Sequence, residues 1–245
     1  MSDPVWICVR QRAGPLVKEC RALRPRLLRS DTAEERRDKM QIIRSPHSAV
    51  CRTRVDRLEL RLALFGYRGS HYTLTFSDEY LPPSFAVCRN RLRAFLARVK
   101  RWKGDRCVDY IYCIEGRHGD HRYHIHVVFR DEDLSPAEVR YLWRYGEVVD
   151  EPVLLKEGGF RRLAVYFNKE ASDGFIIPMG RHPWSCSRGL AQQLPPPERW
   201  TDVSGVIPVP DAVLWARRGS LDNDFGAYYY ASYILAKRHS ALNLE

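Results

Sequence analysis

The feature that most constrains the fold of this chain is an alternating segment, Tyr123–Arg130, which reads Tyr-His-Ile-His-Val-Val-Phe-Arg. In a β-strand, successive side chains point to opposite faces of the sheet. The odd-numbered residues of the segment, all apolar or aromatic, would then face one way, and His124 and His126 the other. Two imidazoles about 7 Å apart on one rigid strand can converge on one divalent metal ion. A pair of solvated histidines on an exposed sheet is the alternative interpretation.

The overall composition is that of a folded protein. Hydrophobic residues make up 44% of the 245 residues and aromatic residues 11%, which is typical of globular chains. No apolar run approaches the roughly 18 residues of a membrane span, and no signal-peptide pattern opens the sequence. We therefore expect no membrane partner and a location in the cytoplasm of a bacterial host.

Cysteine usage and charge narrow the class further. The seven cysteines are odd in number and contain no Cys-x-x-Cys pair, which argues against a disulfide framework or a four-cysteine zinc site. The net charge is +10, with basic clusters in the first third of the chain and in residues 89–103. This clustering favours nucleic acid as a partner, and a merely soluble basic protein is the alternative.

Periodicity predicts strands that alternate with helices between residues 71 and 172. Expected helices cover residues 33–43, 49–65, 85–102, 136–146 and 160–172, and expected strands cover residues 5–9, 71–77, 108–115, 123–130 and 148–155. Residues 227–237 read as a Tyr-rich strand or a short helix. Because at least two strands form a hairpin, an α+β fold with a mainly antiparallel sheet is favoured over a parallel one. We expect a basic, largely helical N-terminal region (1–67), a core (68–200) and a C-terminal extension packed on it (201–245).

Glu115 is the third candidate ligand of the predicted metal site. It ends the strand before the hairpin turn, nine residues ahead of His124, so the returning strand can place it opposite that histidine. A carboxylate beside His124 and His126 makes a three-ligand site with open positions for water or substrate. Residues His118, Asp120 and His121 compete as ligands, but they belong to the turn, where geometry is held less firmly.

A tyrosine between two cations supplies a candidate nucleophile. In the helix expected over residues 160–172, Arg162, Tyr166 and Lys169 share a flank away from the apolar stripe. Cations that orient a phosphate suit a tyrosine hydroxyl for attack on a phosphodiester. A surface tyrosine packed at the rim of the sheet is the alternative. Arg89, Arg93 and Lys100, on the helix over residues 85–102, form either a solvated face or one that contacts DNA phosphates.

Taken in order, these segments resemble the motifs of the HUH endonucleases. His124-Ile125-His126 resembles their His-hydrophobic-His signature, Thr73-Leu74-Thr75-Phe76 their first motif, and Tyr166-Phe167-Asn168-Lys169 their Tyr-x-x-Lys motif. Residues 71–190 are also similar to rolling-circle replication initiators (Rep proteins) of small single-stranded-DNA phages, prophages and plasmids. Those proteins share a Ser-Arg-x-Leu phrase, which matches Ser187-Arg188-Gly189-Leu190 and makes Arg188 a further candidate DNA contact.

The resemblance implies both a fold and a reaction. The fold would be a ferredoxin-like (RRM-like) antiparallel sheet with flanking helices. Tyr166 would attack one phosphodiester of single-stranded origin DNA, leaving a 5′-phosphotyrosine and a free 3′-hydroxyl that primes synthesis and later reverses the linkage. Lys169 would position the scissile phosphate or the metal, and Glu115, His124 and His126 would hold Mg²⁺ or Mn²⁺.

Departures from the family pattern leave alternatives open. Only one tyrosine occupies the helix motif, and only Cys51 precedes the first motif where phage-type members often carry paired cysteines. No Gly-x-x-x-x-Gly-Lys-Ser/Thr segment occurs, so unwinding would need a host helicase, and synthesis a host polymerase. A single-tyrosine transposase is the near alternative, and a relaxase is disfavoured because Tyr166 follows the histidines. A non-catalytic module that binds single-stranded nucleic acid is the alternative from another class.

Overall fold

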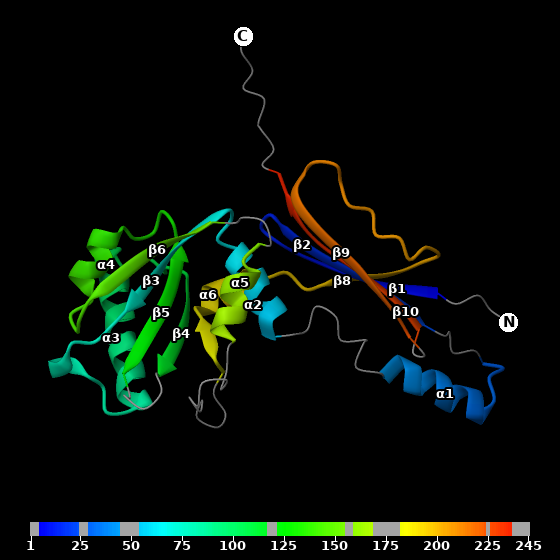
Figure 1. Cartoon of the computed structure of the whole chain (residues 1–245), viewed down its shortest axis with the longest axis horizontal. Coiled ribbons are helices and arrows are strands. Elements are labelled where there is room, and N and C mark those ends of the chain that lie inside the picture. Colours follow the sequence, from blue (N-terminus) through cyan, green and yellow to red (C-terminus); the bar gives the residue numbers. More distant parts are fainter. Residues whose placement is uncertain are drawn as a thin grey trace, which may run out of the picture. The chain divides into compact units, whose positions relative to one another are not determined.

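The computed structural model describes residues 5–24, 29–44, 54–116, 122–154, 159–168, 182–223 and 226–236. The chain divides into two compact units: the first combines residues 1–60, 157–159 and 195–245, and the second combines residues 61–156 and 160–194. Figure 1 labels the elements of both. Their bounds are β1 Val5–Ala13, β2 Leu16–Arg24, α1 Ala33–Arg44, α2 Arg54–Ala63, β3 Arg68–Leu74, α3 Phe85–Trp102, β4 Tyr110–Gly116, β5 Tyr123–Arg130, α4 Pro136–Leu142, β6 Val148–Leu154, α5 Arg161–Phe167, β7 Trp184–Cys186, α6 Arg188–Gln193, β8 Glu198–Asp202, β9 Val213–Asn223 and β10 Gly226–Leu235.

The second unit is built on an antiparallel sheet with the strand order β6-β3-β5-β4-β7. Along the chain, β3, α3, β4, β5, α4 and β6 follow one another. The strand that carries the histidines, β5, lies in the middle of this sheet, between β3 and β4. Its side chains are therefore fixed by pairing on both edges, and the sheet determines where they point.

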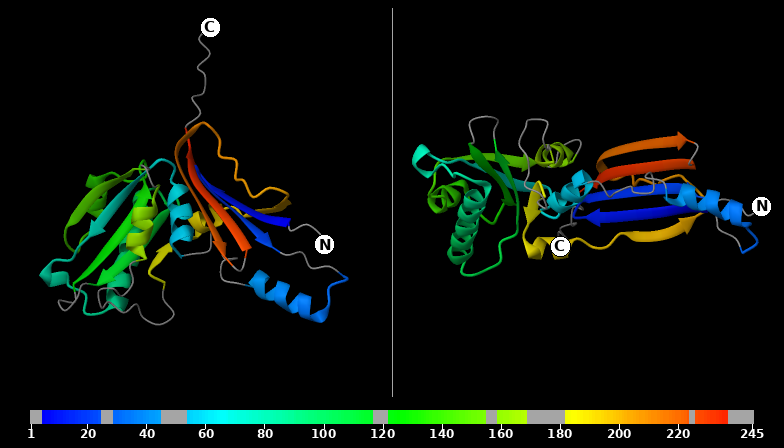
Figure 2. Two further views of the ribbon diagram at one scale, coloured as in Figure 1. Left: turned by 45° about the vertical axis from the view of Figure 1, so that its right-hand side comes forward. Right: turned by 90° about the horizontal axis from the view of Figure 1, so that it is seen from below.

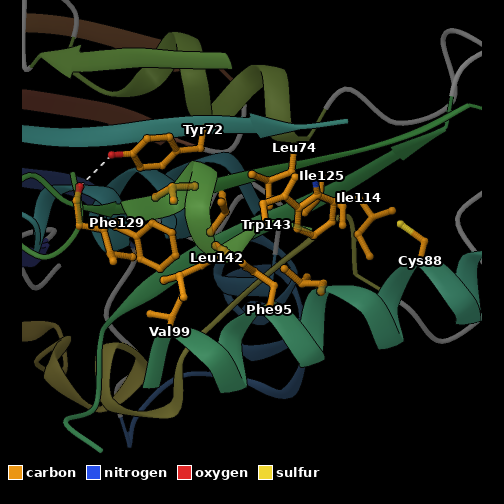
Figure 3. Packing of buried hydrophobic residues seen from close by; sticks show 14 of the residues in the cluster. Tyr72, Leu74, Cys88, Phe95, Val99, Ile114, Ile125, Phe129, Leu142 and Trp143 are labelled. Carbon is orange, nitrogen blue, oxygen red and sulfur yellow. Dashed lines mark hydrogen bonds between the residues drawn. The ribbon is translucent and has the colours of Figure 1, made fainter. Parts of the chain in front are cut away.

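One face of this sheet packs on α3 and α4 around an aromatic core. Ile125, Val127 and Phe129 of β5 are fully buried there. Figure 3 shows Phe95 and Val99 of α3 beneath them. The Tyr72 hydroxyl donates a hydrogen bond of 2.8 Å to the Leu134 carbonyl, drawn dashed in Figure 3, so even this buried polar atom has a partner. The face that the odd-numbered residues occupy is thus the core, as their alternation predicts.

The two helices on this face begin where side-chain caps are available. The Ser84 side chain accepts a hydrogen bond from the Val87 backbone N–H at the start of α3. Ser135 and Glu138 form a capping box at the start of α4, which satisfies two backbone donors that a helix leaves unpaired. Both helix starts confirm the sequence prediction.

The first unit holds a second antiparallel sheet, in the order β8-β1-β2-β10-β9, whose strands lie side by side in Figure 2 (right). Its middle is stabilised by buried charges. The buried Glu19 carboxylate accepts hydrogen bonds from Arg10 and Arg21, and the buried Lys18 ammonium contacts Asp56 and Glu59 of α2 at 2.6 Å each. Each buried charge is thus paired, which is the condition under which burial is tolerated.

These observations confirm the α+β class and correct several details. A largely helical N-terminal region is not confirmed, because residues 5–24 form the β1–β2 hairpin. The first and last parts of the chain, expected as separate segments, contribute strands to one sheet. The Tyr-rich segment is the strand β10, and β9 was not expected at all. Within the described residues, no helix is both long and apolar enough to cross a membrane.

Two helix ends also need comment. The helix expected to reach Gly146 ends at Leu142, because the chain after it pairs with the end of β3: Ser77 N–H donates to Tyr145 O, and Thr75 N–H to Glu147 O. A side chain at Gly146 would lie 2.5 Å from Thr75 O, so the close approach requires glycine. The expected helix end at residue 172 lies outside the described residues.

The aromatic core predicts a large loss of stability on truncation. Phe95 is fully buried and packs edge-on against Phe129 and Trp143. We expect Phe95→Ala to lower the free energy of unfolding by about 3–5 kcal/mol, measured by urea denaturation. Arg93→Ala, an exposed site on the same helix, is the control and should change it by less than about 0.5 kcal/mol. Equal midpoints for the two variants would contradict this description of the core.

Candidate active site

The register of three strands brings the candidate ligands together on the face of the sheet opposite the aromatic core. His126 lies between Thr73 of β3 and Cys113 of β4. One step further along the hairpin, His124 is directly opposite Glu115, which confirms the predicted pairing. Because side chains two residues apart on a strand share a face, His124, His126 and Glu115 all emerge on the same side.

His126 is the centre of a hydrogen-bonded cluster and is only 6% exposed. Its Nε2 atom lies 2.9 Å from Glu115 Oε2. Its Nδ1 atom lies 3.1 Å from His71 Nε2 and 3.2 Å from Thr73 Oγ1. Both ring nitrogens therefore have partners on neighbouring strands, and the imidazole is fixed in orientation before any ligand arrives.

The helix α5 delivers Tyr166 to this cluster. Its residues Ala164 and Phe167 are buried, and the Phe167 ring packs against the rings of His71 and His126. The Cys113 thiol of β4 donates to the Phe167 carbonyl at 3.9 Å. These contacts hold the end of the short helix against the sheet on the face opposite α3.

The Tyr166 hydroxyl points at the two candidate ligands while its ring stays 40% exposed. It donates a hydrogen bond of 2.8 Å to Glu115 Oε2 and lies 3.3 Å from His126 Nε2. The rings of Tyr166 and His126 meet edge to face, with centroids 5.3 Å apart. A reactive hydroxyl is thus held beside a carboxylate and an imidazole, and part of the ring remains open to solvent.

The electrostatics of the cluster keep Glu115 charged. Hydrogen bonding to His126, and to a lesser extent to Tyr166, lowers the pKa of Glu115 to about 2 although partial burial acts to raise it. Burial lowers the pKa of His71 to about 4, with a contribution from His126. Burial also raises the pKa of the Cys113 thiol to about 12. At neutral pH the cluster therefore contains one carboxylate, a neutral His71 and a protonated thiol.

These charge states limit where the protons of His126 can be. An ionised Glu115 can only accept, so in this geometry the His126 Nε2 atom carries the proton, and Nδ1 accepts from His71 or Thr73. Binding of a metal at Nε2 would require that proton to leave and Nδ1 to become the donor. The Thr73 hydroxyl can either donate or accept, so it can support both tautomers. Hydrogen-bond partners on the far ring nitrogen are what orients metal-binding histidines in proteins.

Glu115 and His126 fit a small divalent cation in part. Neighbouring ligands on an octahedral ion with bonds of about 2.1 Å are about 3.0 Å apart, close to the 2.9 Å between Glu115 Oε2 and His126 Nε2. A carboxylate oxygen and an imidazole nitrogen suit Mn²⁺ at least as well as Mg²⁺. In the described part of the chain, however, no three His, Cys, Asp or Glu side chains are grouped as a complete metal site. His124 occupies the register position from which it could complete one.

Other predicted site residues are not assembled here. Lys169 and the turn residues 118–121 lie outside the described residues. Arg162 is exposed on α5, and Arg188 is exposed at the first position of α6. The arginine cluster of α3 lies on the core face of the sheet, away from Tyr166: Arg89, Arg93 and Lys100. Their DNA contacts stay predictions.

His71 is the member of the cluster that the sequence did not single out. It precedes the Thr-Leu-Thr-Phe segment by two residues, and alternation places it on the same face as Thr73. Only 7% of it is exposed. A histidine two residues before a strand threonine is a weak signal by itself. Pairing of β3 with β5 is what gives it meaning.

Comparison with known proteins agrees with this geometry. Residues 70–171 match the model of a family of replication-associated proteins, the ORF2 family. The match covers about two fifths of the chain and runs from β3 through α5, so it contains all the residues of the cluster. Searches of curated proteins and of solved structures found no match. The family match supports a role in DNA replication and an interaction with DNA.

The hydrogen bonding predicts a measurable coupling between His126 and Glu115. In His126→Asn we expect the pKa of Glu115 to rise from about 2 toward its ordinary value of 4.5, because its largest stabilising contact is lost. A titration followed by NMR of the carboxyl carbon measures this. Glu138, whose pKa is also about 2 through contacts with Lys103 and Ser135, is the internal control and should not change. An unchanged pKa of Glu115 would contradict the described contact.

Proposed function

We propose that this protein is a metal-dependent HUH endonuclease that initiates rolling-circle DNA replication by nicking single-stranded origin DNA. The observation that carries the proposal is the placement of the Tyr166 hydroxyl 2.8 Å from Glu115 and 3.3 Å from His126. A surface tyrosine without a catalytic role has no need of a carboxylate and an imidazole at its oxygen. A nucleophile needs an acceptor for its proton and a fixed direction of attack.

The topology of the second unit supports the same assignment. The succession β3-α3-β4-β5-α4-β6 is a βαββαβ arrangement. With those four strands numbered in chain order, the sheet order β6-β3-β5-β4 becomes 4-1-3-2, the order of a ferredoxin-like sheet. The histidines lie on the strand that occupies the third position, inside the sheet. This is the placement that the resemblance to HUH endonucleases implies.

The proposed reaction exchanges one phosphodiester for another. The Tyr166 oxygen attacks phosphorus, a bond from tyrosine to the 5′-phosphate forms, and the bond to the 3′-oxygen breaks. The tyrosine proton passes to the side chains that contact its oxygen, and a proton returns to the departing 3′-oxygen. Attack by a 3′-hydroxyl reverses the sequence and joins strands, so the same residues serve nicking and joining. Lys169 and Arg162, on or next to α5, would bind the phosphate.

A divalent cation completes the proposal. Glu115 and His126, joined by His124, would hold Mg²⁺ or Mn²⁺, which would polarise the non-bridging phosphate oxygens. The chain's own contribution is to fix the ligands: Thr73 and His71 orient His126, and Tyr166 and His126 keep Glu115 ionised. The protein would act in the cytoplasm of a bacterial host, together with the host's helicase and polymerase.

A covalent protein–DNA adduct is the expected product. We expect the full chain, incubated with Mn²⁺ and a pool of single-stranded oligonucleotides of random sequence, to give an adduct that survives a denaturing gel. Tyr166→Phe should abolish it, because the variant lacks the attacking oxygen but keeps the ring that packs at the cluster. His126→Ala should reduce it by at least about 100-fold, the scale expected for a catalytic group.

Tyr141→Phe is the matched control, because Tyr141 is an exposed tyrosine of α4 on the other side of the sheet. It should form the adduct at the wild-type rate. An adduct that persists in Tyr166→Phe would overturn the assignment of the nucleophile. DNA binding without any adduct in the wild type would favour the non-catalytic binding module instead.

A further inference from the structure

The first unit contains a cavity that the proposed nicking reaction does not use. Its volume is about 450 Å³, within the range of about 300–1,000 Å³ typical of small-molecule sites. It lies between the sheet and the segment that joins β8 to β9, which runs back along the sheet in Figure 1. Residues of β1, β9, β10 and this segment line it: Trp6, Gly205, Val206, Arg218, Ser220 and Tyr229.

Strand register places an aromatic pair and a cation on one face here. Tyr229 pairs with Ser220 of β9 on one side and Arg21 of β2 on the other. Arg218 is two residues along β9 from Ser220 and shares its face. The Trp6 and Tyr229 rings lie 5.2 Å apart at 52°, and Tyr229 is 40% exposed. Apolar ring surface and a guanidinium are thus presented together.

The covering segment is shaped to leave the indole in place. A side chain at Gly205 would lie 2.5 Å from Trp6 Cζ2, so only glycine lets the backbone rest on this ring. Val206, the next residue, is largely exposed. The cavity is therefore bounded by a ring that the backbone holds from behind and by side chains that remain accessible.

The other arginines of this face are committed to the fold, whereas Arg218 is at the cavity. Arg10 and Arg21 bind the buried Glu19 and lie over the Trp200 ring. The Asp202 carboxylate, paired in register with Trp6, accepts hydrogen bonds from Arg21 and from the backbone N–H groups of Val203 and Ser204. Its negative charge is therefore compensated, and Arg218 sets the local preference for an anion.

We infer that this cavity binds one base and the adjoining phosphate of single-stranded DNA, outside the nicking site. Tyr229 and Trp6 would stack on the base, and Arg218 would contact the phosphate. Stacking on aromatic side chains combined with basic contacts to the backbone is how proteins hold single strands without reading sequence. The inference rests on the proposed function in taking single-stranded DNA as the ligand, and the net charge of +10 agrees with it.

The test measures equilibrium binding of a fluorescent twelve-residue oligothymidylate by the full chain in a Tyr166→Phe background, which prevents covalent trapping. We expect Tyr229→Ala to weaken binding by about 5- to 100-fold, the range for loss of one stacked base. Tyr229→Phe, which keeps the ring, should bind within about twofold of the parent. An oligonucleotide with abasic residues should bind more weakly to the parent and equally to parent and Tyr229→Ala.

A pair of neighbouring arginines separates the cavity from general electrostatics. Arg218→Ala should weaken binding and reduce the slope of log Kd against log salt concentration by about 0.7, one phosphate contact to a single strand. Arg217→Ala removes the same charge from the adjacent position, whose side chain faces the other side of the sheet, and should have less than a twofold effect. Unchanged thermal unfolding midpoints establish that the variants are folded.

The outcomes separate this inference from the proposed function. If wild-type protein forms the Tyr166 adduct but Tyr229→Ala and Arg218→Ala bind like Arg217→Ala, the cavity inference is overturned and the nicking proposal stands. If the two variants weaken binding while no adduct forms, the reverse holds. Equal weakening by Arg217→Ala and Arg218→Ala would also overturn the inference, because diffuse charge would then explain the binding.

Discussion

The antiparallel pairing of β5 with both β3 and β4 is the constraint on which the second unit depends. It fixes one set of side chains in the aromatic core and the alternate set in the histidine cluster, so the core and the site are two faces of one strand. A slip of one residue would exchange these faces. It would bury His124 and His126 among Tyr72, Phe95 and Phe129, where unpaired imidazoles are costly. The apolar core thus specifies the orientation of the polar site.

Around His126 the same pairing supplies a complete hydrogen-bonded shell. β3 contributes His71 and Thr73, β4 contributes Glu115, and α5 contributes Tyr166. The partners come from three different elements, so the geometry exists only in the folded unit. Charge follows from this geometry: His126 and Tyr166 hold the pKa of Glu115 at about 2, which keeps a carboxylate ready for a cation or for the proton of the tyrosine.

Local signals in the sequence were sufficient for much of the second unit. The Ser84 cap, the Ser135–Glu138 capping box and the alternation of β5 each act within a few residues, and each is found as predicted. The opposition of Glu115 and His124 followed from hairpin geometry. The same local patterns identified Tyr166, because helical spacing separates it from the apolar stripe of its helix.

What the sequence could not supply depends on contacts between distant segments. Residues 5–24 carry arginines and a glutamate that look solvated, yet Glu19 is buried because Arg10 and Arg21 neutralise it. The Tyr-rich segment became β10 because β2 and β9 pair with both its edges. His71 joined the site only through β5. The helix α4 stopped early because its following residues pair with the end of β3. In each case tertiary pairing overrides local preference.

The two units would serve one substrate by different physical means. In the second unit a buried and charged cluster positions an oxygen for reaction, whereas in the first an open aromatic surface beside Arg218 offers stacking without chemistry. The first arrangement tolerates little displacement, since hydrogen bonds of about 2.8 Å define it. The second tolerates any base, because every base has an aromatic face.

The central claim is that the Tyr166 oxygen forms a covalent bond to DNA. The most direct measurement is mass spectrometry of the peptides released from the protein–DNA adduct after digestion of both protein and DNA. We predict that a nucleotide remains attached to the peptide that contains Tyr166, through its side-chain oxygen and a 5′-phosphate. A nucleotide on another residue, or a 3′-phosphate at the linkage, would contradict the claim.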